Sequence, residues 1–124
     1  MSEPRLTAIL CNYNHAIHLP EALDALCGQS RPQDEIIVVD DGSTDSSVEV
    51  ISGYADRYDN VRFLRNRTNQ GLLPSANRAL EAAEGDFVTW CAADDILLPG
   101  TFERVSAALG RYPTAGVVAA ETII

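Results

Sequence analysis

The sequence predicts an α/β fold, a mostly parallel sheet with helices on both of its faces. Three observations lead to this class. Short apolar runs alternate along the chain with longer segments of helical periodicity. The 124 residues suit a single domain, and 46% apolar and 22% charged residues lie close to the globular average. Strands that alternate with helices form βαβ units, whose strands run parallel.

Five runs are candidate strands. Residues 6–11 form a short apolar run, and residues 35–40 form a stronger one that is rich in β-branched side chains. Three further candidates follow at residues 61–64, 87–91 and 116–120. Short apolar runs of this kind are typical of strands that are buried on both faces of a sheet.

Four helical segments separate the strands. The second is expected to start near Ser43 and Thr44, which are good N-caps, with Asp45 placed well for the helix dipole. The third begins near Pro74 and ends before Gly85. The expected apolar stripes are Leu19, Leu23, Leu26 and Cys27; Val48, Ile51, Ala55 and Tyr58; Ala76, Leu80 and Ala83; and Phe102, Val105, Leu109 and Tyr112.

The charged residues exclude several kinds of function. The net charge is −9, which argues against a nucleic-acid partner, because such proteins need a basic surface to neutralise phosphates. All nine basic residues are Arg, so mechanisms that need a lysine amine are excluded. An acidic chain that binds a phosphorylated ligand needs a divalent cation or a local Arg.

Cysteine usage and hydropathy indicate the compartment. The three cysteines are Cys11, Cys27 and Cys91, an odd number without a Cys-x-x-Cys pair. A disulfide framework or a zinc site is therefore not expected, and a reducing compartment is. The sequence shows neither an 18-residue apolar run nor the apolar core of a signal peptide. We expect a cytoplasmic protein.

Polar residues follow four of the predicted strands, at the points where these strands end. Because parallel strands end at one edge of the sheet, where ligands bind in such folds, their loops are expected to converge. Oxygen ligands from Asp suit Mg or Mn, and Arg65 or Arg67 could bind a phosphate oxygen. The four loops are Asn12 to His15, Asp40 to Ser43, Arg65 to Arg67, and Ala92 to Asp95.

Each candidate also has a structural interpretation. Asp45 fits a turn or helix cap better than a ligand, and Asp40 fits a buried structural carboxylate as well as a site residue. Tyr13 could stack on a flat ring or serve only in packing. His15 and His18 have no ligand partners at a suitable spacing, so we interpret both as surface residues. Trp90 and the cysteines are expected in the core.

Taken together, four segments resemble glycosyltransferase family 2 in order and spacing. The Val-Val-Asp-Asp-Gly-Ser-Thr-Asp run is highly specific, and the likeness extends from Leu6 to about Ala120. It implies the nucleotide-binding half of the Rossmann-like GT-A fold, over residues 1–124, with the acceptor-binding half absent. The segments are Cys11-Asn12-Tyr13-Asn14, residues 37–45, Asn69-Gln70-Gly71 and residues 94–99.

The resemblance implies a role for individual residues. Tyr13 would stack on the nucleobase, Asp41 would accept a hydrogen bond from its ring N–H, and Asp40 would support Asp41. Arg67 would approach the base or the phosphates. Asp94 matches the last Asp of the family's Asp-x-Asp motif, which reaches the metal. Asn14 and Asp95 are carried over as supporting residues.

The resemblance also implies the activity. The expected function is metal-dependent, inverting glycosyl transfer with Mn or Mg, as in cell-envelope polysaccharide biosynthesis. The donor would be a nucleotide-diphosphate sugar, first a UDP-sugar, with dTDP or GDP as alternatives. The acceptor would be a carbohydrate or a lipid-linked molecule, with the full-length protein at the membrane periphery. The oligomeric state is left open, with a homo-oligomer as one alternative, because an interrupted sheet edge favours self-association.

Two departures from the family pattern matter, and the first keeps an alternative open. Ala92 stands where the family has the first Asp of Asp-x-Asp, and Ala76 stands before Asn77, where the family often has Arg or Lys. The general base is expected beyond residue 124, so no catalytic residue is named and the isolated chain is expected to be inactive. The alternative is a non-catalytic nucleotide-binding or interaction module on a degenerate transferase fold. A phospho-receiver domain would need a Lys, and a dinucleotide-binding domain would need glycines after the first strand.

Overall fold

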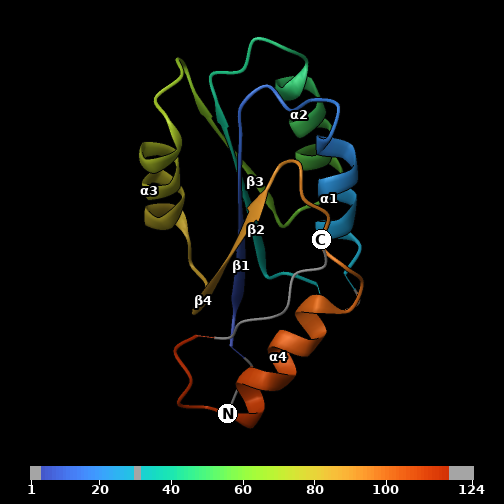
Figure 1. The fold of residues 1–124 in the computed structure, drawn as a ribbon, viewed down its shortest axis with the longest axis vertical. Coiled ribbons are helices and arrows are strands. Elements are labelled where there is room, and N and C mark those ends of the chain that lie inside the picture. Colours follow the sequence, from blue (N-terminus) through green and yellow to red (C-terminus); the bar gives the residue numbers. More distant parts are fainter. Residues whose placement is uncertain (1–3, 30–31, 118–124) are drawn as a thin grey trace.

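The computed structural model describes residues 4–29 and 32–117 (Figure 1). Helices and strands alternate along these residues, as predicted. No helix among them combines the length and the apolar character needed to cross a membrane. The elements are β1 (Leu6–Asn12), α1 (Leu19–Cys27), β2 (Glu35–Asp41), α2 (Ser47–Arg57), β3 (Val61–Asn66), α3 (Leu72–Ala82), β4 (Phe87–Ala92) and α4 (Thr101–Arg111).

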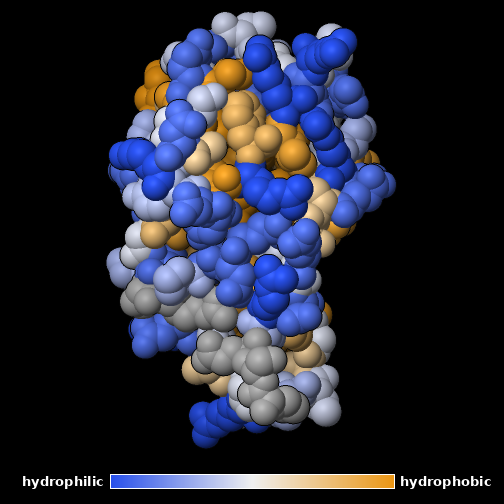
Figure 2. Space-filling view, turned by 180° about the vertical axis from the view of Figure 1, so that it is seen from behind, coloured by the Kyte–Doolittle hydropathy of each residue, from blue (hydrophilic) through white to orange (hydrophobic). Residues whose placement is uncertain are grey.

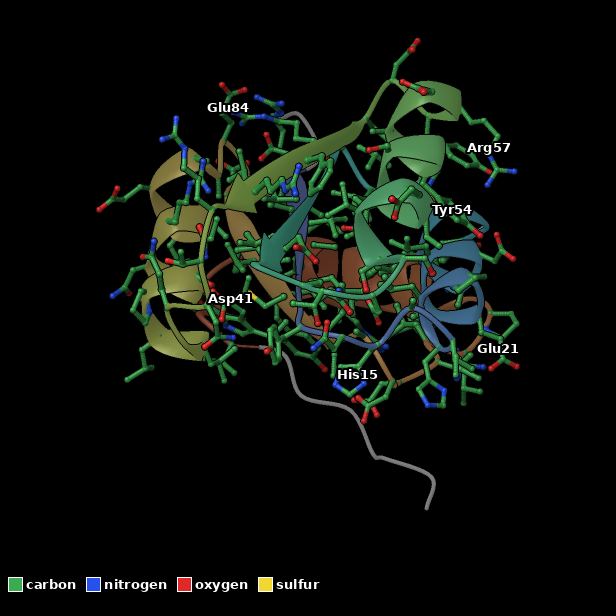
Figure 3. All side chains as sticks on the ribbon, turned by 90° about the horizontal axis from the view of Figure 1, so that it is seen from above. His15, Glu21, Asp41, Tyr54, Arg57 and Glu84 are labelled. Carbon is green, nitrogen blue, oxygen red and sulfur yellow. The ribbon has the colours of Figure 1, made fainter. Side chains whose placement is uncertain are left out.

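The strands form one parallel sheet in the order β3-β2-β1-β4. The chain first builds outward from β1 through β2 to β3, and then crosses back through α3 to place β4 on the other side of β1. Seen from above, α3 lies on one side of the sheet, and α1 and α2 lie on the other (Figure 3). The α/β class and the parallel sheet are confirmed.

Alternation along the strands divides the core in two. Leu10 and Val38 pack with α1, α2 and Phe102 of α4, whereas Ile9 and Val39 pack with Ala79 of α3. Successive side chains of a strand point to opposite faces of the sheet. As β2 ends, the same rule sends Asp40 to the α1 and α2 face and Asp41 to the α3 face.

The start of α2 differs from the prediction. The helix begins at Ser47, so Ser43 and Thr44 lie in the preceding loop and do not cap it. Ser46 is the N-cap residue and makes no side-chain cap hydrogen bond, whereas Asp45 before it accepts at Oδ1 from the backbone N–H of Ser47 at 2.9 Å and from the Ser47 hydroxyl. The Ser43 hydroxyl oxygen accepts instead from the backbone N–H of Asn14 at 3.0 Å, and the hydroxyl donates to Asp40 at 2.6 Å.

The buried stripe of α3 is also shifted from the prediction. Ser75 and Ala79 are buried, whereas Leu80 is 44% exposed. The helix ends at Ala82, before Gly85. Gly85 has a different reason to be glycine: a Cβ there would lie 2.4 Å from the Thr7 hydroxyl oxygen. The glycine lets the chain pass close to β1 as it enters β4.

Trp90 does not lie in the core, contrary to the prediction, and is 54% exposed. It pairs with Ile9 in the sheet register and shares the α3 face, but β4 is an edge strand and α3 packs on β1 and β2. Apolar surface also shows from behind, where hydrophilic residues surround an apolar area in the upper half of the molecule (Figure 2).

The C-terminal part of the chain agrees only partly with expectation. Phe102 and Leu109 of α4 are buried as predicted, whereas Tyr112 follows the helix and is 60% exposed. Of the fifth predicted strand, Gly116 and Val117 are not in strand conformation, and residues 118–120 lie outside the described residues.

Candidate functional site

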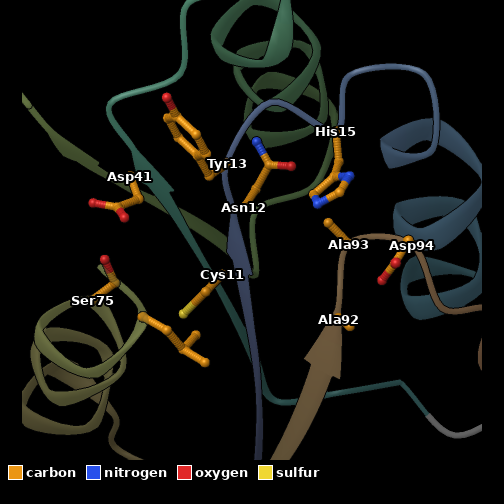
Figure 4. Close-up of a pocket in the computed structure, with 10 residues that line it drawn as sticks. Cys11, Asn12, Tyr13, His15, Asp41, Ser75, Ala92, Ala93 and Asp94 are labelled. Atoms are coloured by element: carbon orange, nitrogen blue, oxygen red, sulfur yellow. The ribbon is translucent and has the colours of Figure 1, made fainter. Parts of the chain in front are cut away.

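A pocket lies at the carboxyl ends of the strands, where the chain reverses the order in which it builds the sheet. Ligands bind at this switch point in open parallel sheets. The cavity has a volume of about 210 Å³, and the loops after β1 and β4 and the first turns of α3 surround it (Figure 4). Its lining residues are Cys11, Asn12, Tyr13, His15, Asp41, Leu72, Ser75, Ala92, Ala93 and Asp94.

Asp41 lies on the α3 side of this pocket and is 5% exposed. Its Oδ1 accepts hydrogen bonds from Asn66 Nδ2 at 3.0 Å and from the backbone N–H of Gln70 at 2.8 Å. Its Oδ2 accepts from Asn69 Nδ2 at 3.1 Å and from the backbone N–H of Gly71 at 2.9 Å. A carboxylate has about four lone-pair sites. All four are used, one by Asn66 at the end of β3 and three by the loop between β3 and α3.

These hydrogen bonds keep Asp41 ionised. Burial raises the pKa of the carboxyl, but the N–H of Gln70, the Asn66 amide, the N–H of Gly71 and the Ser75 hydroxyl outweigh it, and the pKa lies below its ordinary value of 3.8. A buried negative charge is therefore built into the wall of the pocket. It also affects Cys11, since burial and then the charge of Asp41 raise the pKa of that thiol. Cys11 is a protonated, half-buried wall residue.

Two residues that support Asp41 were missed in the sequence analysis. Asn66 is buried at the end of β3 and donates to both Asp41 and Ser75, the latter at 2.9 Å. Arg78 of α3 donates from Nη1 to Asn66 Oδ1 at 2.9 Å, which fixes the orientation of the amide. An Asn at a strand end was a possible signal for this role, whereas nothing in the helical pattern indicated Arg78.

Asp40 is fully buried on the opposite face of the sheet and is not among the residues that line the pocket. It accepts hydrogen bonds from Asn12 Nδ2 at 3.0 Å and from the backbone N–H of Ser43 at 3.0 Å. Asp40 therefore has the surroundings of a buried structural carboxylate, because it joins the end of β1 to the loop after β2.

Asn14 clamps the loops after β1 and β2 together. Its φ of 55° lies in the left-handed region, which Asn tolerates better than most residues. Its Oδ1 accepts from the backbone N–H of Thr44 at 2.8 Å, and its own N–H donates to the Ser43 hydroxyl at 3.0 Å. Asp45 completes the clamp by accepting the N–H of Ala16 at 3.1 Å. Asn14 thus holds together the two loops that follow β1 and β2, and it does not line the pocket itself.

Tyr13 and His15 form the outer rim. Tyr13 is 44% exposed and lines the pocket, so its ring is available for stacking and is not consumed by packing. His15 is exposed, as expected, but also lines the pocket, whereas His18 does not. Figure 4 shows Tyr13 and Asp41 on one side of the pocket and His15 on the other.

The loop after β4 offers one carboxylate to the pocket. Asp94 is exposed and lines it, and Ala92 beside it has no ligand atom to offer. Asp95 lies instead with Cys91 and Leu97 at a smaller cavity toward α1, and its N–H donates to the Ala92 carbonyl at 3.2 Å.

The donor set of the pocket limits how it could hold a metal. Within residues 4–29 and 32–117, no three His, Cys, Asp or Glu side chains gather closely enough to hold a metal. The residues fit a cation that takes one hard oxygen ligand from Asp94 and the others from a ligand and water.

The structure thus brings together Tyr13, Asp41 and Asp94 at one pocket, from the ends of three strands. Asp40, Asn14 and Asp95 are not among the residues that line it. Arg67 is exposed in the loop before α3 and is not among the lining residues.

Comparison with known proteins agrees with this architecture. The sequence model of Glycosyl transferase family 2 matches residues 7–122. An uncharacterized glycosyltransferase of Haemophilus influenzae is 34% identical over 104 residues, which is 84% of this chain and 42% of that protein. The chain thus spans less than half the length of this relative.

Two solved structures share the fold. S. aureus TarS 1–349 in complex with UDP-GlcNAc has a TM-score of 0.82 and 29% identity, over 88% of this chain and 32% of that one. The mannosyltransferase PcManGT from Pyrobaculum calidifontis, in complex with GDP-Man and Mn2+, has a TM-score of 0.75 and 29% identity, over 86% of this chain and 32% of that one. Together with the family match over most of the chain, these likenesses establish that the chain belongs to glycosyltransferase family 2 and forms a domain of the GT-A type.

Proposed function

We propose that this chain is the donor-binding part of a metal-dependent, inverting glycosyltransferase that binds a nucleotide-diphosphate sugar, first a UDP-sugar. The observation that supports the proposal is the convergence of Tyr13, Asp41 and Asp94 at one pocket of the sheet's switch point. An exposed ring and a fixed buried carboxylate suit a base and the wall beside it, and an exposed carboxylate suits a metal-bound diphosphate.

The roles within the pocket follow from these surroundings. Tyr13 would stack on the base, because its ring is partly exposed at the rim. Asp41 would hold the loop between β3 and α3 as the wall beside the base. Asp94 would hold Mn or Mg, which when bound neutralises the charge of the diphosphate leaving group. With one chain ligand, the cation should bind weakly until the diphosphate is present.

A thermal-shift screen tests the donor proposal. UDP, GDP, dTDP and CDP are each added with and without Mn, and ligand binding to the folded state raises the unfolding midpoint by mass action. We expect the largest rise for UDP with Mn. Asp94→Ala should keep the rise with UDP alone and lose the additional rise with Mn. A protein that responds to none of the nucleotides would contradict the proposal and favour the non-catalytic module, for which Ala92 is the supporting observation.

Transfer to an acceptor is a separate matter. The general base is expected outside these 124 residues, so we predict that the chain alone transfers no sugar to a carbohydrate or lipid-linked acceptor. The measurement is acceptor-dependent release of nucleoside diphosphate by the purified chain. Robust turnover would contradict the prediction, whereas slow donor hydrolysis would not, because water can enter an open site.

A further inference from the structure

We propose that the amide oxygen of Asn12 accepts a hydrogen bond from the nucleotide, either from a ribose hydroxyl or from a base N–H, and so contributes to nucleotide specificity. The inference rests on the proposed function and adds a residue to which the sequence analysis gave no role. Asn12 ends β1 at the floor of the pocket, and its side chain is 2% exposed.

The two ends of this amide have different surroundings. Nδ2 donates to Asp40 at 3.0 Å and to the Ser43 hydroxyl at 3.3 Å. Oδ1 is buried and has no hydrogen-bond partner among the described residues. Buried polar atoms are almost always paired, so an unpartnered acceptor on a pocket wall points to a ligand that pairs with it.

The amide cannot reverse its orientation to relieve this. A flip would turn Oδ1 toward the Asp40 carboxylate, which would set one acceptor against another and remove the donor that Asp40 uses. Asp40 is fully buried and keeps its other contacts through Ser43. Asp40 is therefore a positioning residue, which holds the carbonyl end of Asn12 on the pocket side.

The other buried side-chain acceptors that line the pocket, on Asp41 and Ser75, already accept hydrogen bonds. Both oxygens of Asp41 already accept two hydrogen bonds each. Ala92 and Ala93 offer no side-chain acceptor, and Figure 4 shows the Asn12 oxygen directed to the side where Ala93 and His15 lie. The rim residues Tyr13 and His15 are exposed, so their side chains can change rotamer and open a path as a ligand enters.

The experiment is a calorimetric titration of the protein with four probes in Mn: UDP, 2′-deoxy-UDP, 3′-deoxy-UDP and 3-methyl-UDP, each analogue lacking one donor. In the wild type, the analogue that lacks the bonded donor should bind about three- to tenfold more weakly than UDP, the range for one neutral hydrogen bond. In Asn12→Ala that same analogue and UDP should bind equally. The analogue that shows this pattern distinguishes the ribose from the base.

Three further variants control the result. Asn12→Ser keeps a hydroxyl donor for Asp40 but has no amide oxygen at the pocket, so it should also lose the discrimination between UDP and the analogue. It replaces Asn12→Ala in the experiment if that variant does not fold. Asp40→Asn frees the orientation of the intact Asn12 amide and should reduce the discrimination. Asn77→Ala, an exposed Asn of α3 outside the pocket, should behave as the wild type.

Two outcomes would overturn the inference, and they are distinguishable. If each analogue is weakened by the same factor in the wild type and in the Asn12 variants, Asn12 accepts no bond from the nucleotide, while the proposed function stands. If the wild type binds neither UDP nor any analogue, the proposed UDP donor fails, and this inference fails with it.

Discussion

The two carboxylates that face the pocket have opposite surroundings. Asp41 is buried and accepts four hydrogen bonds, one from Asn66 at the end of β3 and three from the loop between β3 and α3. Asp94 is exposed in the turn after β4, beside an alanine. The side of the pocket near Asp41 is thus formed before any ligand arrives, whereas the side near Asp94 needs a ligand to complete it. Preformed walls suit recognition of a constant part of the donor, and an open carboxylate suits a cation that arrives with the diphosphate.

The largest effect is expected from Asp41→Asn. The substitution replaces one carboxylate oxygen by an NH2 group that faces two donors, so two charge-assisted hydrogen bonds are lost. We expect the free energy of unfolding to fall by about 3–5 kcal/mol, measured by denaturant titration. Nucleotide binding should weaken as well, because the loop loses its anchor. A fully stable variant that loses affinity only for ligands with a base would show instead that Asp41 contacts the base directly.

The same carboxylate predicts a pH dependence. The pKa of Asp41 in the folded protein lies below its ordinary value of 3.8, so the unfolded chain takes up the proton first as the pH falls. The stabilisation is complete above pH 3.8 and is lost as the pH falls through the lower, folded value. Between pH 5 and pH 3, wild type should therefore lose more stability than Asp41→Asn. The variant keeps a residual dependence from Glu35 and Asp45, whose pKa values are also lowered.

Gly42→Ala should disturb the side of the pocket near Asp41 through a steric clash with the loop between β3 and α3. Gly42 has a φ of 74°, and a Cβ there would lie 2.6 Å from the backbone of Thr68 and Asn69. We expect a loss of about 2–3 kcal/mol in the free energy of unfolding. Gly53→Ala is the matched control, because a Cβ at this site in α2 meets nothing within 4 Å. It should leave the stability unchanged or raise it, and a similar loss in both variants would contradict the packing argument.

A smaller effect is expected from Arg78→Ala. Arg78 fixes the Asn66 amide that donates to Asp41, and its own side chain is exposed, so the stability should fall by about 1 kcal/mol. Nucleotide affinity should fall with it, and the acid loss of binding should move to higher pH, because Asp41 is then held less firmly. Arg104→Ala, an exposed Arg of α4, serves as the control. Equal stability and equal nucleotide affinity in the two variants would show that Arg78 does not support the site.

The smallest effect on stability is expected from Asp94→Ala. Asp94 is exposed, so its removal should change the free energy of unfolding by less than about 0.5 kcal/mol. UDP should raise the affinity for Mn in the wild type, as measured by calorimetric titration of Mn with and without UDP. This gain should nevertheless be lost in Asp94→Ala and mostly kept in Asp95→Ala. If UDP still raises the Mn affinity fully in Asp94→Ala, another carboxylate holds the metal. The proposed difference between the Asp41 and Asp94 sides of the pocket would then be wrong.

The family and the order of the elements could be predicted because they depend on local residue patterns. β-branched runs, helical periodicity and an Asp-Asp-Gly-Ser run between a strand and a helix are properties of neighbouring residues. The convergence of Tyr13, Asp41 and Asp94 followed from one general rule, that parallel strands end at one edge. Their roles toward a nucleotide and a metal stay predictions.

What only the tertiary structure decided is how each polar group is paired. The sequence contains Asp40 and Asp41 as neighbours, but the alternation of β2 sends one to a buried contact with Asn12 and the other to the loop that contains Gly71. Trp90 is exposed because β4 lies at an edge, which no strand pattern reveals. Arg78, Asn66 and Asp41 are joined through hydrogen bonds between residues 12 and 25 positions apart in the chain. Such pairings depend on distances between elements, and these are fixed only when the sheet and α3 pack together.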